Sequence, residues 1–184
     1  TESISATVSD EMKQDAVVAV LIAAVCMLLY IWIRFKNLTV GASSVLALFH
    51  DVIVVLMVYA VFSHFIQVGN TFIACMLTIV GYSINATIVI FDRVRENRKK
   101  GSSRKDMAEV VNDSITQTLS RSINTSLTTF VMVFMLAILG VDSVRQFAIP
   151  LIVGIISGAY SSVCLASTMW YFMDKKFGKN KKKK

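Results

Sequence analysis

The sequence has little of what a soluble domain of its size usually contains. Charged residues make up only 17% of its 184 residues, a single residue is proline, and 55% are hydrophobic. Soluble domains carry about a quarter charged residues, so this composition excludes an ordinary soluble domain. Long apolar runs stand where the charge is missing. The sequence therefore predicts an all-α fold, a polytopic bundle of transmembrane helices.

The sequence also lacks the spacings of a metal, disulfide or catalytic centre. Cys26, Cys75 and Cys164 each lie inside an apolar run, where cysteine acts as a small hydrophobic residue. His50 and His64 would lie about 21 Å apart on one helix, too far to hold one haem. No nucleophile stands beside a base in a known motif. We therefore expect no metal site, no cofactor and no enzymatic activity.

Five apolar runs are long enough to cross a bilayer, which takes about 20 helical residues. Residues 103–120, between the third and fourth runs, have apolar positions at helical spacing and predict an amphipathic helix on the cytoplasmic interface. The bundle of 16–172 is expected to follow the end of an extracytoplasmic segment, 1–15, and to precede a basic cytoplasmic tail, 173–184. The predicted spans are 16–35, 40–62, 71–91, 122–139 and 147–172.

The net charge of +7 comes mainly from basic residues on one side of these spans. They follow the first span, the third span and the last. The positive-inside rule then predicts a cytoplasmic C-terminus and an external N-terminus in a bacterial cell membrane. An external start further suggests a hydrophobic segment before Thr1 in a longer parent chain, although a natural N-out protein is the alternative. The basic runs suit membrane lipids rather than nucleic acid, because no aromatic-studded basic surface accompanies them.

Two ionisable residues lie where a charge is costly, about 2.5–3.5 kcal/mol at a helix centre. Asp51, well inside the second span, is a candidate proton carrier. The alternative is a structural carboxyl, hydrogen-bonded to neighbouring backbone or to His50. Arg121 opens the fourth span within a polar stripe that favours a wet interior face, whereas the alternative is snorkelling to the head groups. The stripe consists of Gln117, Arg121, Asn124, Thr125 and Thr128.

The third span has a polar middle. Gly81, Tyr82 and Asn85 share one helical stripe, whereas Ser83 and Thr87 point to the other side. Lipid offers polar groups no partners at this depth, so both sides are expected to face protein or a hydrated path. Simple attachment of one helix to another is the plainer alternative. In the fifth span, a GxxxG match predicts close helix approach.

The run GYSINATIVIFDRVREN, residues 81–97, resembles the signature of the SecF family of bacterial Sec protein-export subunits. Three other segments are similar to SecF spans, and LFHDV at 48–52 resembles its His-Asp-Val motif. Those three are YIWIRF at 30–35, TLSRSINTSLTT at 118–129 and GIISGAYSS at 154–162. The motif residues are His50, Gly81, Tyr82, Ser83, Asp92, Arg93, Arg95, Glu96 and Asn97.

This resemblance implies spans two to six of a six-span half of the RND transporter superfamily. It also implies partners: SecD in the same or a separate chain, the SecYEG channel and the translocating polypeptide. The expected role is to assist protein export with the proton gradient. One alternative is half of an RND-type exporter of lipids or small molecules.

The chain departs from the SecF signature at Ala86, where the family commonly has aspartate. Alanine cannot bind a proton, so the partner of Arg121 is in doubt. One hypothesis is that Asp51, Asn85 and Arg121 line the remaining proton path. A second is that protons pass only through the SecD half, and a third is that this half is a scaffold that carries no protons.

Overall fold

The structure of the protein is a computed structural model. It describes residues 14–15, 18–19, 21–23, 25–27, 29–31, 33–35, 38–62, 70–99 and 106–181. Every described residue between 14 and 35 is helical. The predicted segment 1–15 lies almost wholly outside the described residues, and the predicted first span, 16–35, lies partly outside them.

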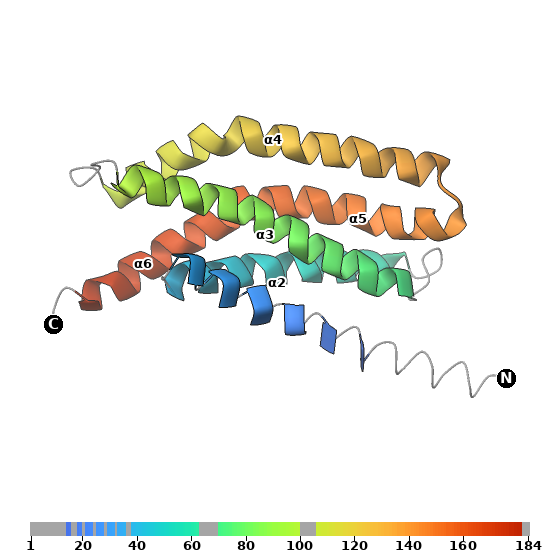
Figure 1. Cartoon of the computed structure of the whole chain (residues 1–184), viewed down its shortest axis with the longest axis horizontal. Coiled ribbons are helices and arrows are strands. Elements are labelled where there is room, and N and C mark those ends of the chain that lie inside the picture. Colours follow the sequence, from blue (N-terminus) through green and yellow to red (C-terminus); the bar gives the residue numbers. More distant parts are fainter. Residues whose placement is uncertain are drawn as a thin grey trace.

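Long helices run side by side through the described part of the chain (Figure 1). Their bounds are α2 Leu38–Val61, α3 Asn70–Lys99, α4 Met107–Leu139, α5 Asp142–Tyr160, the π-helix η2 Ser161–Ala166 and α6 Ser167–Lys181. The last three follow one another without a break. Four helical stretches are long and apolar enough to cross a membrane, at Thr39–Val61, Phe72–Lys99, Met107–Leu139 and Asp142–Lys176. The predicted all-α membrane bundle is confirmed.

Helix α4 is one continuous helix of 33 residues, which includes both the predicted interface helix and the predicted fourth span. It begins after Asp106, whose carboxylate accepts a hydrogen bond from the Met107 backbone N–H at 2.8 Å. Aspartate is a favoured residue at this capping position. Val111 is buried in the same hydrophobic cluster as Val94 of α3. The apolar face near the start of α4 therefore packs against this chain.

Helix α5 occupies the centre of the bundle and packs against α2, α3 and α4 (Figure 1). Two hydrophobic clusters lie along the bundle, and α2 contributes Leu48 to one and Val55 to the other. Asp51 lies between these two residues on α2. Lipid tails are as apolar as these side chains, so close packing rather than the hydrophobic effect holds the helices together.

The GxxxG match of α5 allows the close approach that the sequence predicts. A Cβ atom at Gly154 would overlap the side chain of Ile79 on α3. At Gly158 it would lie 3.4 Å from the Ser83 Cβ atom, an ordinary contact distance. Small residues at this crossing therefore bring the backbone of α5 close to α3, and with it the serines that both helices carry.

Candidate functional site

Asp51 lies in the centre of the bundle and is completely buried. Three serine hydroxyls donate to its carboxylate. Ser83 Oγ lies 2.5 Å from Oδ2, Ser157 Oγ lies 2.7 Å from Oδ1, and Ser161 Oγ lies 2.6 Å from Oδ2. These lengths are typical of a hydroxyl that donates to a carboxylate. We call Asp51, Ser83, Ser157 and Ser161 the Asp51 cluster.

Three chain segments build the Asp51 cluster. Ser83 comes from α3, and Ser157 and Ser161 are four positions apart on the last helical stretch, so that they share one face. His50 Nδ1 lies 3.3 Å from Asp51 Oδ1, with its side chain 40% exposed. The carboxyl of Asp51 therefore has a hydrogen-bond partner on every side, and a neighbouring imidazole reaches towards the surface.

Ser161 is also the first residue of the π-helix η2. Its hydroxyl oxygen lies 3.3 Å from the Gly158 carbonyl oxygen as well as 2.6 Å from Asp51. π-Helical turns are rare and occur frequently at functional sites. The hydroxyl of Ser161 thus has two acceptors within reach, one on the buried acid and one on the helix backbone.

The two sides of α3 differ as the sequence predicts. Ser83 and Thr87 are buried inside the bundle, whereas Asn85 is exposed. Asn85 lines a cavity of about 110 Å³ between α3 and α4. Tyr82 and Ser126 line the same cavity, and the Tyr82 hydroxyl donates a hydrogen bond to Ser126 Oγ at 2.8 Å. The cavity is lined by Tyr82, Asn85, Ala86, Val89, Arg121, Ser122, Thr125 and Ser126.

The structure therefore brings two of the three predicted path residues together and separates the third. Asn85 and Arg121 share the cavity between α3 and α4, whereas Asp51 lies on the other side of α3. Ala86 lines the same cavity as Arg121, at the position where the SecF signature has aspartate. A single path through all three residues stays a prediction.

The polar stripe of α4 lies beside α3 but is open to the surface. Its five residues, Gln117, Arg121, Asn124, Thr125 and Thr128, are all exposed. Gln117 accepts hydrogen bonds from Arg93 and Asn97 of α3, and Arg121 and Thr125 line the cavity between α3 and α4. The wet interior face that the sequence favours for this stripe stays a prediction. The buried residues of α4 are Val110, Val111, Ser114, Thr118 and Val133.

The FDRVREN motif attaches the end of α3 to the first helix. Arg34 and Asp92 form an ion pair at 3.0 Å, with both side chains about 40% exposed. Arg95 NH1 donates to the Arg34 backbone oxygen at 3.1 Å. Two motif residues therefore bind Arg34: Asp92 binds the Arg34 side chain, and Arg95 binds the Arg34 backbone.

The same motif attaches α3 to α4. Arg93 Nε donates to Gln117 Oε1 at 2.6 Å, and Asn97 Nδ2 donates to Ser114 Oγ at 2.8 Å. Glu96 accepts from Arg93 NH1 at 2.6 Å, one turn along α3. The charged part of the signature thus has a structural role in this chain, because Arg93 and Asn97 fix α3 to α4.

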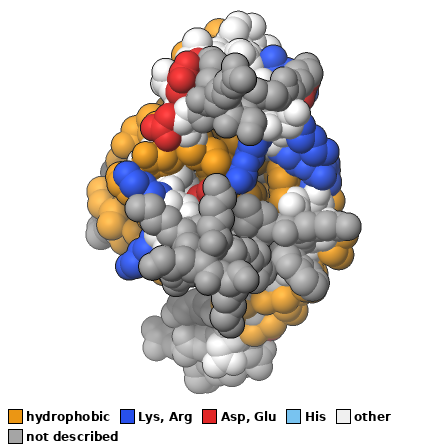
Figure 2. Space-filling view, turned by 90° about the vertical axis from the view of Figure 1, so that its left-hand side faces the viewer, with side chains coloured by type: hydrophobic (Ala, Val, Ile, Leu, Met, Phe, Trp, Pro, Cys, Tyr) orange, Lys and Arg blue, Asp and Glu red, His pale blue; other side chains and the backbone are white. Residues whose placement is uncertain are grey.

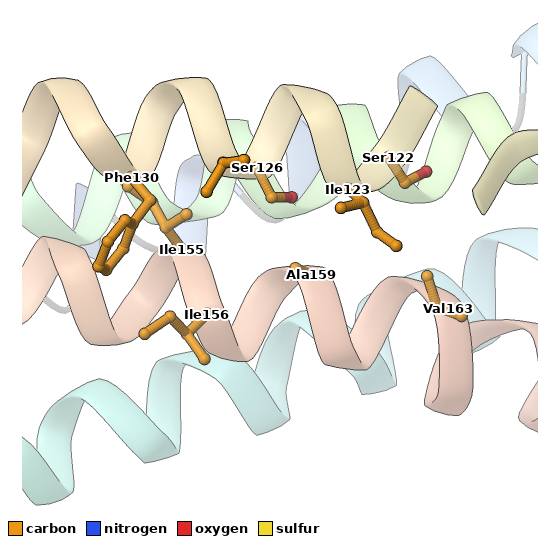
Figure 3. Close-up of a pocket in the computed structure, with 9 residues that line it drawn as sticks. Ser122, Ile123, Ser126, Phe130, Ile155, Ile156, Ala159 and Val163 are labelled. Atoms are coloured by element: carbon orange, nitrogen blue, oxygen red, sulfur yellow. The ribbon is translucent and has the colours of Figure 1, made fainter. Parts of the chain in front are cut away.

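A larger cavity, about 270 Å³, lies between α4 and α5, and none of the described side chains that line it is ionisable (Figure 3). Phe130, Ile155 and Ile156 project into it, and Ser122 and Ser126 supply its polar atoms (Figure 3). An apolar groove of this kind can hold an acyl chain or a helix, but it offers no group for proton transfer. We therefore take the Asp51 cluster as the candidate functional site.

The sequence singles out Asp51 as a candidate site residue, but it does not identify Ser83, Ser157 and Ser161 as the hydrogen-bond partners of Asp51. Ser157 and Ser161 lie 106 and 110 positions from Asp51. Their signal is present nonetheless: two hydroxyls on one face of an apolar helix, beside a GxxxG match, need a polar partner in another helix. An isolated buried carboxyl is the complementary signal.

Comparison with known proteins shows the family of the chain. The family model described as "Protein export membrane protein SecD/SecF, C-terminal" matches residues 1–176. The protein translocase subunit SecF of Alicyclobacillus acidocaldarius is 45% identical over 170 residues, which cover 91% of this chain and 54% of that one. The protein translocase subunit SecDF of Bacillus subtilis is 40% identical over 170 residues, which cover 91% of this chain and 23% of its own.

A solved structure has the same fold. It is the crystal structure of SecDF, a translocon-associated membrane protein, from Thermus thermophilus. Its TM-score is 0.83 at 42% identity, over 89% of this chain and 22% of that chain. The chain therefore spans about half the length of the SecF relative and about a quarter of the SecDF proteins. With a family model matched along almost its whole length, the chain belongs to the SecD/SecF family of protein export membrane proteins.

Proposed function

We propose that this chain is the membrane part of a SecF subunit that assists protein export through a SecYEG channel. The observation that supports this most is the shared fold and 42% identity with SecDF over 89% of the chain. The relatives are named protein translocase subunits, which favours export over an exporter of lipids or small molecules. In this proposal residues 1–15 end an external segment, and the C-terminus is cytoplasmic.

The partner in the membrane is SecD, and the polar stripe of α4 is its contact surface. Lipid cannot satisfy an exposed arginine and amides at membrane depth, so protein or water must. A Cβ atom at Gly81, on the same side of α3 as Asn85, would meet nothing within 4 Å in the described chain. That leaves room for a second bundle to pack closely. The name of the Bacillus subtilis relative, SecDF, combines SecD and SecF in a single chain.

The Asp51 cluster is the part that responds to the proton gradient. An ionised Asp51 accepts hydrogen bonds from all three serine hydroxyls, whereas a protonated Asp51 carries an O–H that must itself donate a hydrogen bond. Ser161 can allow this change, because its hydroxyl can turn from Asp51 Oδ2 to the Gly158 carbonyl, 3.3 Å away. Protonation then alters a hydrogen bond at the first residue of the π-helix η2. This is how one proton changes the helix that continues into α6.

Arg121 acts on the other side of α3, towards SecD. In this half its cavity contains Ala86 and Asn85 but no acid among the described residues. In this proposal the acid that pairs with Arg121 comes from SecD. A half that never exchanges protons, and serves only to hold SecD, is the competing function that Ala86 favours.

The test is proton-driven export into membrane vesicles that contain the full-length protein with SecD and SecYEG. We expect Asp51→Asn and Arg121→Met to remove the stimulation by the proton gradient, with SecD still co-purifying. Asp142→Asn is the matched control, because the side chain of Asp142 is 94% exposed and lies outside both sites. Normal stimulation in both variants would overturn the coupling, and failure of the wild type to co-purify with SecD would overturn the SecF function.

A measurement of proton flux distinguishes the scaffold function from proton coupling through Asp51. In reconstituted vesicles, Ala86→Asp places a carboxyl in the cavity of Arg121. A flux that is present in the Ala86 protein and disappears in Asp51→Asn supports coupling through Asp51. A flux that appears only with Ala86→Asp supports the scaffold, and the role of Asp51 is then rejected.

A further inference from the structure

A third cavity lies at the end of the bundle where the basic residues gather, away from the Asp51 cluster. Figure 2 shows this end, where Lys and Arg side chains surround deeper hydrophobic ones. The cavity measures about 100 Å³ and lies between the first helix, α2, α3 and α6. Its lining residues are Phe35, Val40, Phe91, Val94, Arg95, Arg98 and Trp170.

Aromatic rings pack edge to face along one wall of this cavity. The Phe35 and Phe91 ring centroids lie 6.3 Å apart, and those of Phe91 and Trp170 lie 5.9 Å apart. Phe91 and Trp170 are buried in the hydrophobic cluster that joins α3 to α6. This wall is rigid and apolar, and it lies directly beside two arginines of α3.

Every polar side-chain group in the lining is a hydrogen-bond donor. Arg95 and Arg98 contribute guanidinium groups. Trp170 contributes the apolar part of its ring, because its indole N–H is buried out of reach of a water molecule and has no acceptor among the described residues. Arg95 uses NH1 to bind the Arg34 backbone oxygen, which leaves it other donors. No Asp or Glu lines the cavity in the described part of the chain.

We propose that this cavity binds a phosphate group, carried by an anionic phospholipid or free in solution. Arginine binds phosphate oxygens with two parallel N–H donors, and a site with donors alone requires an acceptor of this kind. A volume of about 100 Å³ is that of about three liquid waters, at about 30 Å³ each, enough for one phosphate group. Basic pockets between membrane helices on the cytoplasmic side suit lipid head groups.

The aromatic wall is the part of the site that suits a lipid. A phospholipid carries its glycerol and the first acyl carbons next to the phosphate, and these would lie against Phe91 and Trp170. Free phosphate has no apolar part to place there. The site is independent of the export function proposed above, because it uses none of the residues assigned to the proton or to SecD.

The test is native mass spectrometry of the full-length protein in detergent, with equal amounts of dioleoyl-phosphatidylglycerol and dioleoyl-phosphatidylcholine. We expect wild type to retain phosphatidylglycerol selectively. Arg98→Gln should bind it about tenfold more weakly, because a charge-assisted hydrogen bond is lost. Arg98 is exposed, so the variant should fold, which its unfolding midpoint will show. Lys176→Gln is the matched control: it removes the same charge from an exposed residue of α6 outside the cavity.

Inorganic phosphate, added without lipid, separates the two sources. If millimolar phosphate raises the unfolding midpoint of wild type but not of Arg98→Gln, and displaces phosphatidylglycerol, then free phosphate is a ligand. If the lipid binds and inorganic phosphate does not, then the ligand is the phosphate of the lipid head group. Equal lipid retention by all three proteins, with no response to phosphate, would overturn the proposal. So would an equal loss in Lys176→Gln, because bulk surface charge would then explain the binding.

Discussion

Removing one hydroxyl from the Asp51 cluster should cost more than removing an ordinary buried serine. Interhelical hydrogen bonds in membranes contribute about 0.6 kcal/mol on average and about 1.7 at most. Hydrogen bonds to a charged group contribute about 1.5–3 kcal/mol. The 2.7 Å bond from Ser157 to Asp51 belongs to the second class if the carboxylate is ionised. Ser157→Ala should therefore lower the free energy of unfolding by about 1.5–3 kcal/mol.

Ser43 supplies the matched control for that measurement. It is completely buried, but its hydroxyl donates to the Val40 carbonyl of its own helix at 2.9 Å. A local bond of this kind adds little to a helix, so Ser43→Ala should cost about 0.5 kcal/mol or less. The assay is unfolding of the full-length protein in mixed micelles, followed by circular dichroism as sodium dodecyl sulfate increases.

The decisive comparison repeats Ser157→Ala in an Asp51→Asn background. An amide at position 51 makes only neutral hydrogen bonds with the serines, so the cost of Ser157→Ala should fall to about 1 kcal/mol. The difference between the two backgrounds isolates the charged part of the bond. If Ser157→Ala costs the same in both backgrounds, or no more than Ser43→Ala, the cluster is ordinary polar packing and our reasoning about it fails.

Two further predictions concern helix packing. Gly154→Ala should destabilise the protein by about 1–3 kcal/mol relative to Gly158→Ala, because only the first Cβ overlaps a neighbouring side chain; equal unfolding midpoints in micelles would contradict the close approach of α5. The Arg34–Asp92 ion pair should show a coupling free energy of about 0.2–1 kcal/mol in a double-mutant cycle of Arg34→Gln and Asp92→Asn, since both groups are about 40% exposed. A coupling above 2 kcal/mol would mean that the pair is shielded from solvent in the complex.

The sequence predicts the helices well because long apolar runs are a strong signal, and it predicts the two sides of α3 because the helical period is regular. Ser83 and Asn85 lie on different sides, as the period requires, and the structure shows that Ser83 is buried and Asn85 exposed. Hydropathy does not predict where a helix continues beyond the membrane. The start of α4 is polar enough to read as a separate element, although a single helix runs from Met107 to Leu139.

The site was harder to predict because it depends on pairing between distant segments. A carboxyl on α2 and hydroxyls more than 100 residues later have no local pattern that joins them. Likewise, the stripe that contains Arg121 is visible in the sequence, but only the packing of α4 shows that it is exposed and lies beside α3. The π-helix η2 has neither glycine nor proline in SSVCLA to announce it.

The length of α3 has a mechanical consequence. Its 30 residues measure about 45 Å, whereas the hydrocarbon core of a bilayer is about 30 Å thick. The surplus carries Arg93 and Asn97, which bind the start of α4. A tilt of α3 by about 5° about its midpoint would displace that end by about 2 Å. A rearrangement beside Asp51 that tilts α3 would therefore move Arg93, Asn97 and whatever binds them.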